Sequence, residues 1–134
     1  MEESFNKVRD ELENGIERFQ KSFSDNQFWE KLRRFARNAG AEVVYLALLL
    51  YYVLKHPGTT TADRAKIIGA LGYFILPIDL VPDAIPIVGF TDDLAALTWG
   101  IYCVAKNVTP EIKALAAAKV REWFGNDIQL SDKI

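Results

Sequence analysis

The sequence has few of the residues that usually carry catalysis. Its 134 residues include one cysteine, Cys103, and one histidine, His56, and no serine lies between Asp25 and Gln129. These counts exclude an internal disulfide, a zinc site of paired cysteines and, in practice, a Ser-His-Asp triad. A glycine-rich phosphate loop is also missing. We therefore predict a protein that is not an enzyme and carries no cofactor, with Cys103 in the core and His56 at a helix end.

Positive charge is missing from the middle of the chain. From Ile67 to Ala105 there is no lysine or arginine, and the acids there are Asp79, Asp83, Asp92 and Asp93. The net charge of the whole chain is -2, so the composition does not favour nucleic-acid binding. The N-terminal segment is charged and amphipathic, unlike a cleavable signal peptide. We expect the protein in the cytoplasm or on the cytoplasmic side of the inner membrane.

A long hydrophobic run is missing too. The apolar segments Val43–Leu54 and Ile67–Ile78 have twelve residues each, whereas a membrane-spanning helix needs about 20. Lengthening the first segment would submerge Glu42, and lengthening the second would submerge Asp79, which is costly in hydrocarbon. Two interpretations stay open: a helical hairpin buried at the centre of a bundle, or a short hairpin inserted in a membrane.

The sequence does contain helical periodicity from end to end. Apolar residues recur every three or four positions from Phe5 to Phe23 and from Phe28 to Ala39, which is typical of amphipathic helices. Residues 109–111 supply a cap, a proline and an acid for a last helix. The sequence predicts an all-α fold, a small bundle of five to six helices with a central apolar helical hairpin and amphipathic flanking helices. We expect a single domain over residues 1–125 and a loose C-terminal tail over residues 126–134.

Two glycines interrupt the second apolar segment. Gly69 and Gly72 are three positions apart, so they share one face of a helix. Glycine costs a helix about 1 kcal/mol relative to alanine. We therefore expect a second helix to pack closely against this face, since close packing would offset that cost.

An acidic segment, Leu76–Asp93, follows these glycines and has two interpretations. In the structural one it is a corner, in which prolines end one helix and Thr91 caps the next. Asp92 and Asp93 then lie in the first turn of that helix, where the helix dipole favours acids. In the functional one several carboxylates converge and need a counter-charge, because clustered acids repel. A hard cation such as Mg²⁺ or Ca²⁺ would bind Asp79, Asp83, Asp92 and Asp93; alternatively, the counter-charge is an arginine, for which the candidates are Arg33, Arg34 and Arg37.

The same segment resembles a known family. The residues that carry the resemblance are the run Pro77-Ile78-Asp79-Leu80-Val81-Pro82-Asp83, followed by Gly89 and the pair Asp92-Asp93. This pattern is similar to that of the YkvA-like bacterial proteins, domain-of-unknown-function family 1232, over about residues 62–104. The resemblance implies a small helical domain that is often described as membrane-associated, with no known reaction.

These observations lead to one functional hypothesis and one alternative. The first is a non-enzymatic helical module that is membrane-associated or partner-binding through its apolar hairpin, with the aspartate segment as a structural corner. The alternative is a soluble helical bundle with a cation-binding or carboxylate-based site at the four aspartates.

Overall fold

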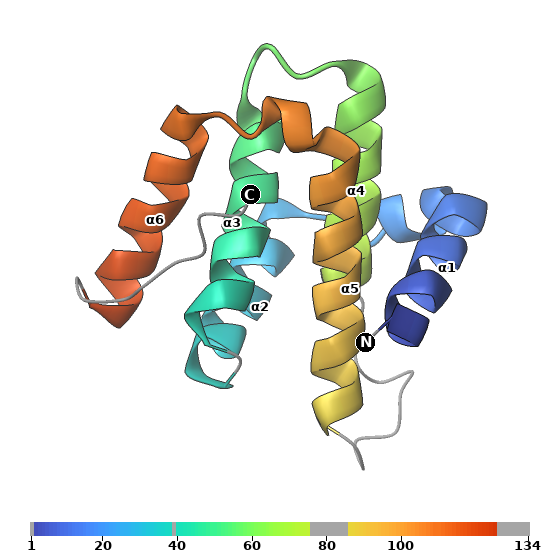
Figure 1. Cartoon of the computed structure of the whole chain (residues 1–134), viewed down its shortest axis with the longest axis horizontal. Coiled ribbons are helices and arrows are strands. Elements are labelled where there is room, and N and C mark those ends of the chain that lie inside the picture. Colours follow the sequence, from blue (N-terminus) through green and yellow to red (C-terminus); the bar gives the residue numbers. More distant parts are fainter. Residues whose placement is uncertain (1, 39, 76–85, 126–134) are drawn as a thin grey trace.

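The helical periodicity becomes six α-helices and one short 3-10 helix in the computed structural model, which describes residues 2–38, 40–75 and 86–125 (Figure 1). No strand occurs in these ranges, so the predicted all-α bundle is confirmed. The elements in chain order are α1 (Glu2–Gln20), α2 (Asp25–Asn38), α3 (Ala41–Lys55), α4 (Thr61–Ile75), α5 (Pro86–Val104), η2 (Ala105–Asn107) and α6 (Pro110–Phe124).

The predicted central hairpin consists of α3 and α4. Helix α3 contacts α2, α4, α5 and α6, and every residue from Val44 to Leu50 is buried. A helix with neighbours on all sides needs no polar face, so packing inside the bundle accounts for the all-round apolar sequence of α3. Among the helices of the described ranges, none combines the length and the apolarity that a membrane span requires.

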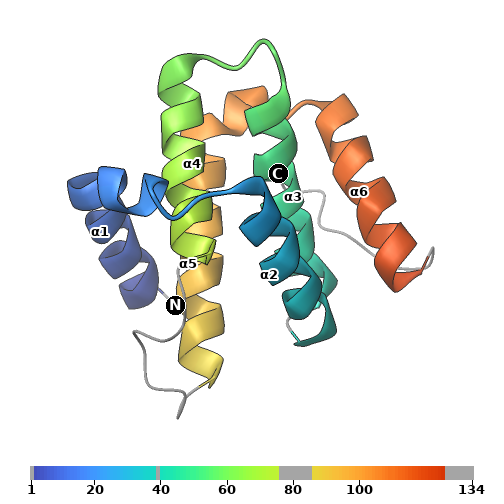
Figure 2. The same cartoon turned by 180° about the vertical axis from the view of Figure 1, so that it is seen from behind.

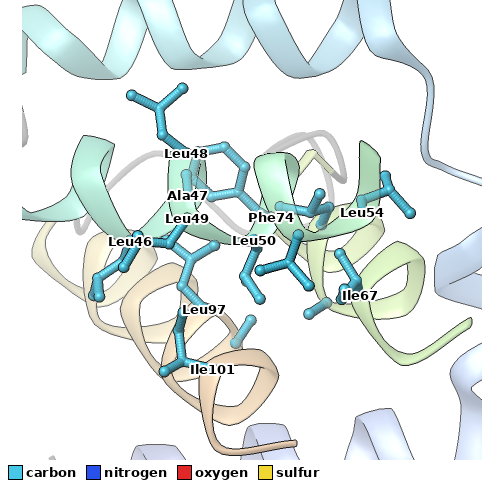
Figure 3. Close-up of a cluster of buried hydrophobic side chains, with 14 of the residues drawn as sticks. Leu46, Ala47, Leu48, Leu49, Leu50, Leu54, Ile67, Phe74, Leu97 and Ile101 are labelled. Carbon is cyan, nitrogen blue, oxygen red and sulfur yellow. The ribbon is translucent and has the colours of Figure 1, made fainter. Parts of the chain in front are cut away.

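The main core forms where α3, α4 and α5 meet. Figure 3 shows the leucines of α3 lying among Ile67 and Phe74 of α4 and Leu97 and Ile101 of α5. Leu50, Ile67, Phe74 and Leu97 are fully buried. Because each buried aliphatic or aromatic side chain stabilises a fold by about 1.5–3 kcal/mol, this cluster fixes the relative positions of the three helices.

Helix α1 lies against α4 and α5, on the side of the molecule opposite α6 (Figure 1). Its apolar stripe is core, since Val8 and Leu12 are fully buried and Phe19 is nearly so. The helix bends at Gly15, whose φ of -137° and ψ of 33° are not helical. The bend, which the sequence analysis did not predict, turns the last part of α1 onto α4, and the joining segment 21–24 then runs across α4 towards α2 (Figure 2).

Aromatic side chains attach α2 and α6 to α3. The Phe28 ring of α2 stacks on the Tyr51 ring of α3 with centroids 4.7 Å apart. Trp29 contacts Tyr51 at 5.1 Å and Trp123 of α6 at 6.2 Å. These rings fill the space between three helices and hold the inner sides of α2 and α6 against the core.

The cap predicted at residue 109 for the last helix is confirmed, and α4 begins with a similar cap. The hydroxyl of Thr60 accepts a hydrogen bond from the backbone N–H of Asp63 at 3.1 Å, and Thr109 does the same for Ile112 at 3.2 Å. Gly125 ends α6 with a φ of 106°, a left-handed value that favours glycine. The predicted loose tail, residues 126–134, lies outside the described residues.

Candidate functional site

One of the four predicted aspartates, Asp93, is buried in the described part of the chain, with 6% of its surface exposed. Helix α5 begins at Pro86, so Asp93 is its eighth residue, and none of its first-turn residues is acidic. The prediction that Thr91 caps this helix and that Asp92 and Asp93 occupy its first turn is therefore wrong. Proline is favoured at the first helical position because it has no N–H to leave unpaired, so Pro86 begins the helix and does not belong to the predicted corner.

The charge that faces Asp93 comes from Lys31 of α2. The Lys31 Nζ atom lies 3.1 Å from the Asp93 Oδ2 atom, and only 4% of Lys31 is exposed. The same ammonium donates a hydrogen bond to the backbone carbonyl of Phe74 and lies 4.6 Å from the centre of the Phe74 ring. A single cation thus joins α2, the end of α4 and the first half of α5.

Burial sets the electrostatics of this pair. Removal of Lys31 from water lowers its pKa below 10.5, and the nearby charge of Arg34 lowers it further, although the charge and hydrogen bond of Asp93 act in the opposite direction. Desolvation of a buried ion pair can equal or exceed its mutual attraction. The pair is therefore a specific tie between α2 and α5, and its net contribution to stability is smaller than its short distance suggests.

The arginines that were predicted to face the acids do not form the described ion pair of Asp93. Arg33 and Arg34 are exposed, and the described ion pair of Asp93 uses Lys31 instead. Asp79 and Asp83 lie outside the described residues, as do the side chains of Arg37 and Asp92. Whether an arginine faces Asp79 or Asp83 stays a prediction.

Lys31 had a recognisable signal that the sequence analysis missed. It lies three residues after Phe28 and directly before Leu32, both fully buried, so it borders the apolar stripe of α2. A lysine at such a position can lay its aliphatic stem along apolar surface. Arg33 and Arg34, by contrast, are exposed on the outer side of the helix.

A cation site is not built in the described ranges. No group of three or more His, Cys, Asp or Glu residues in these ranges could hold a metal ion. At Asp93 the Lys31 ammonium already stands where a bound cation would lie. The predicted ligand set of Asp79, Asp83, Asp92 and Asp93 falls mostly outside the described residues and stays a prediction.

A second feature is the surface of α4 and α5 that holds α1. We call it the α1-docking face, and it comprises Ala65, Gly69, Gly72, Tyr73, Trp99 and Tyr102. A Cβ atom on Gly72 would overlap the carbonyl group of Phe19 and lie 2.6 Å from its carbon. A Cβ atom on Gly69 would lie 2.9 Å from the Cδ1 atom of Ile16. The expected close approach at both glycines is therefore confirmed, and the helix that approaches is α1.

Polar and aromatic contacts surround this close approach. The Gln20 amide donates a hydrogen bond to the backbone carbonyl of Ala65 at 2.9 Å. The Tyr73 hydroxyl lies 3.4 Å from Glu11, and the Trp99 indole nitrogen lies 3.4 Å from Glu13. The ring of Phe5 meets that of Tyr102 edge-on, with centroids 5.9 Å apart. These contacts lie along the whole of α1 and therefore fix its register on the face.

Three further residues with reactive or ionisable side chains are Asp63, His56 and Cys103. At the start of α4, the buried Asp63 accepts a hydrogen bond from Asn107 of η2 at 3.0 Å. The His56 ring is exposed, and its Nδ1 atom accepts a hydrogen bond from the backbone N–H of Gly58 at 3.0 Å, which agrees with the predicted role at a helix end. Cys103 is half-buried, and burial raises the pKa of its thiol. A raised pKa makes a thiol less reactive.

Comparison with known proteins identifies one segment. Residues 63–99 match the family model described as "Protein of unknown function (DUF1232)". The match covers most of α4 and of α5, so it includes Gly69, Gly72 and Asp93, whereas Lys31 and the whole of α1 lie outside it. Neither the curated proteins nor the solved structures gave a match. The family-like segment thus supplies the acid and the glycines, and the preceding helices supply their partners.

Proposed function

We propose that the chain is a non-enzymatic helical module that binds an amphipathic helix of a protein partner on the α1-docking face. The observation that carries the proposal is the docking of α1, a helix that lies on α4 and α5 much as a bound peptide helix lies on a receptor. Recognition of an amphipathic helix by an apolar surface is a common mode of protein association.

The position of the face supports this choice within the hairpin. Helix α3 is enclosed by four other helices, so a partner could reach it only by taking the bundle apart. Helix α4 also presents a surface to α1, and release of α1 would expose that surface without separating α3 from α5. A partner can therefore bind the α4 side of the hairpin with less disruption of the bundle than binding to α3 would require.

The shape of the face supports a helix as the partner. Two glycines bare the backbone of α4, and the main chain of α1 at Phe19 comes into direct contact with it. Glycines one turn apart favour close approach of a second helix, because no side chain holds the two backbones apart. Tyr73 and Trp99 add donors at the edge of the face, where a partner with acids at matching positions would be aligned.

A reversible lock tests the proposal. A Cβ atom on Gly69 would lie 3.8 Å from the Cβ atom of Ile16, which is the mean separation across a disulfide. The variant I16C/G69C, with Cys103→Ala to remove the native thiol, should therefore fix α1 in place when oxidised and free it when reduced. The two forms have the same sequence, so each controls for the folding of the other.

The probe is a synthetic fluorescent peptide of residues 2–24, which carries the stripe that fits the face. We expect the reduced protein to bind this peptide and the oxidised protein to bind it at least tenfold more weakly. A matched peptide with Leu12→Asp and Phe19→Asp should not bind either form. Equal binding to the oxidised and reduced forms, or none to the reduced form, would contradict the proposal.

The same two forms distinguish a protein partner from a membrane. Both would be floated with vesicles of phosphatidylcholine and phosphatidylglycerol. If the reduced protein floats with vesicles, the oxidised protein does not, and neither binds the peptide, then the face binds lipid and the protein-partner proposal is wrong. Retention of the chain in carbonate-washed cell membranes would also indicate that the face binds lipid.

A further inference from the structure

We infer that the helix that competes for the α1-docking face is the α1 of a second copy of this chain, so that two chains exchange their first helices. The inference rests on the proposed function, because it requires the face to release α1. It adds the identity of the partner, which the proposed function leaves as any amphipathic helix.

The fit between face and helix is the first argument. The face matches α1 at three kinds of position: the Gly72 backbone against Phe19, the Gly69 backbone against Ile16, and the Ala65 carbonyl against the Gln20 amide. A second copy presents the same helix with the same contacts. No foreign sequence needs to be assumed for the partner to be complementary.

The way in which α1 is attached is the second argument. Its main contacts are with α4 and α5, and the segment that joins it to α2 has four residues, 21–24. This segment forms a turn closed by backbone hydrogen bonds of 3.0 Å from Ser22 to Phe19 and 3.2 Å from Phe23 to Gln20. If the turn opens, four extended residues span about 13 Å, so α1 can swing away from its own chain. Exchange of one element across a short hinge is a low-cost route to a dimer.

The exchanged arrangement is closed. Each chain gives its α1 and receives the α1 of the other, so both docking faces are filled and no apolar stripe stays exposed. The contacts on each face are those of the single chain, and the hinge is the part that changes. The exchanged fraction should therefore rise with protein concentration.

A complementary pair of cysteine variants tests the exchange. One chain carries Gly69→Cys, whose side chain collides with its own Ile16, and the other carries Ile16→Cys, which leaves room for it. Both also carry Cys103→Ala. The two chains are mixed as full-length proteins, warmed to their melting midpoint, cooled and oxidised, and covalent dimers are measured on a non-reducing gel. A control chain carries Asn14→Cys instead, at an exposed position of α1.

We expect at least fivefold more covalent heterodimer with Ile16→Cys than with Asn14→Cys, and a yield that rises with concentration. If Gly69→Cys alone does not fold, the chain with Gly69→Cys and Ile16→Ala replaces it. No excess over the Asn14→Cys control, in a preparation where the I16C/G69C chain closes its internal disulfide, would overturn the inference. If the heterodimer shows no excess but the reduced protein still binds the 2–24 peptide, the exchange is wrong and the proposed function stands. If the reduced protein does not bind the peptide either, the proposed function is wrong as well.

Discussion

The substitution Gly72→Ala tests the packing on which the α1-docking face depends. The added methyl group would lie 2.6 Å from the carbonyl carbon of Phe19, about 1 Å closer than two carbon atoms approach at their optimal separation. The obstacle is backbone, so rotation of a side chain cannot relieve the overlap. The end of α1 must therefore move away from α4 by more than about 1 Å, since the carbonyl oxygen of Phe19 lies even closer than the carbon.

The loss of unfolding free energy expected for Gly72→Ala follows from the displacement of the end of α1. Overpacking of a close contact costs about 1–3 kcal/mol, and weakening the hydrogen bond from Gln20 to Ala65 costs about 1 kcal/mol. The higher helix propensity of alanine stabilises α4 by about 1 kcal/mol relative to glycine, which offsets part of this loss. The net effect is a loss of about 2 kcal/mol, which corresponds to a decrease of about 1 M in the urea midpoint if the denaturant slope is about 2 kcal/mol per M.

Urea unfolding followed by circular dichroism measures this loss, and tryptophan emission adds a local signal because the indole of Trp99 lies beside Glu13 of α1. The matched control is Gly15→Ala, since a Cβ atom on Gly15 would meet nothing within 4 Å. We expect the control to change stability by less than about 1 kcal/mol. A midpoint for Gly72→Ala equal to or above that of the unchanged chain would refute the argument.

Three further predictions concern the buried pair and the acidic segment. Asp93→Ala should lower the free energy of unfolding by about 3 kcal/mol, because it removes the carboxylate that lies 3.1 Å from the buried Lys31 ammonium. Adding Lys31→Met should recover most of this loss. A double-mutant cycle in urea measures both effects, and additive losses would contradict the pairing. Burial lowers the pKa of Lys31 in the folded state below 10.5, so between that lowered pKa and 10.5 the unfolded chain binds more protons than the folded chain. The stability of the unchanged chain relative to Lys31→Met should therefore rise with pH in this window. A difference in stability that stays flat or falls would show that burial does not dominate the pKa of Lys31. Mg²⁺, Mn²⁺ or Ca²⁺ at millimolar concentration should leave Tm unchanged, since Lys31 already neutralises Asp93, whereas an increase that Asp79→Asn abolishes would support a cation site.

Local sequence signals predicted most of the helices and their ends. A threonine hydroxyl at position 60 or 109 satisfies backbone N–H groups of its own helix, and this depends on a few neighbouring residues. The same reasoning failed at Pro86, where a helix-start signal and a loop signal are the same residue. The bend at Gly15 was missed for a related reason, because a glycine within a helical pattern is compatible with either a straight or a bent helix.

The candidate site depended on contacts between distant parts of the chain. A buried carboxylate without a counter-charge is costly, and at Asp93 the counter-charge is Lys31. The choice of Lys31 depended on the rotation of α2 about its axis and on its height along α4, and both are set by Phe28 and Leu32 packing into the core. Periodicity gives the face of a helix but not the residue opposite it.

The sequence by itself determined that this chain is helical, that its middle is too apolar to be exposed to water, and that Gly69 and Gly72 require a close neighbour. These properties follow from spacing and residue type, which act within one or two turns of a helix. Only the tertiary structure decided that α3 is covered on all sides, that the close neighbour is α1, and that Lys31 faces Asp93. Each of these outcomes depends on which apolar stripes pack together, and many pairings of similar stripes satisfy the same local rules.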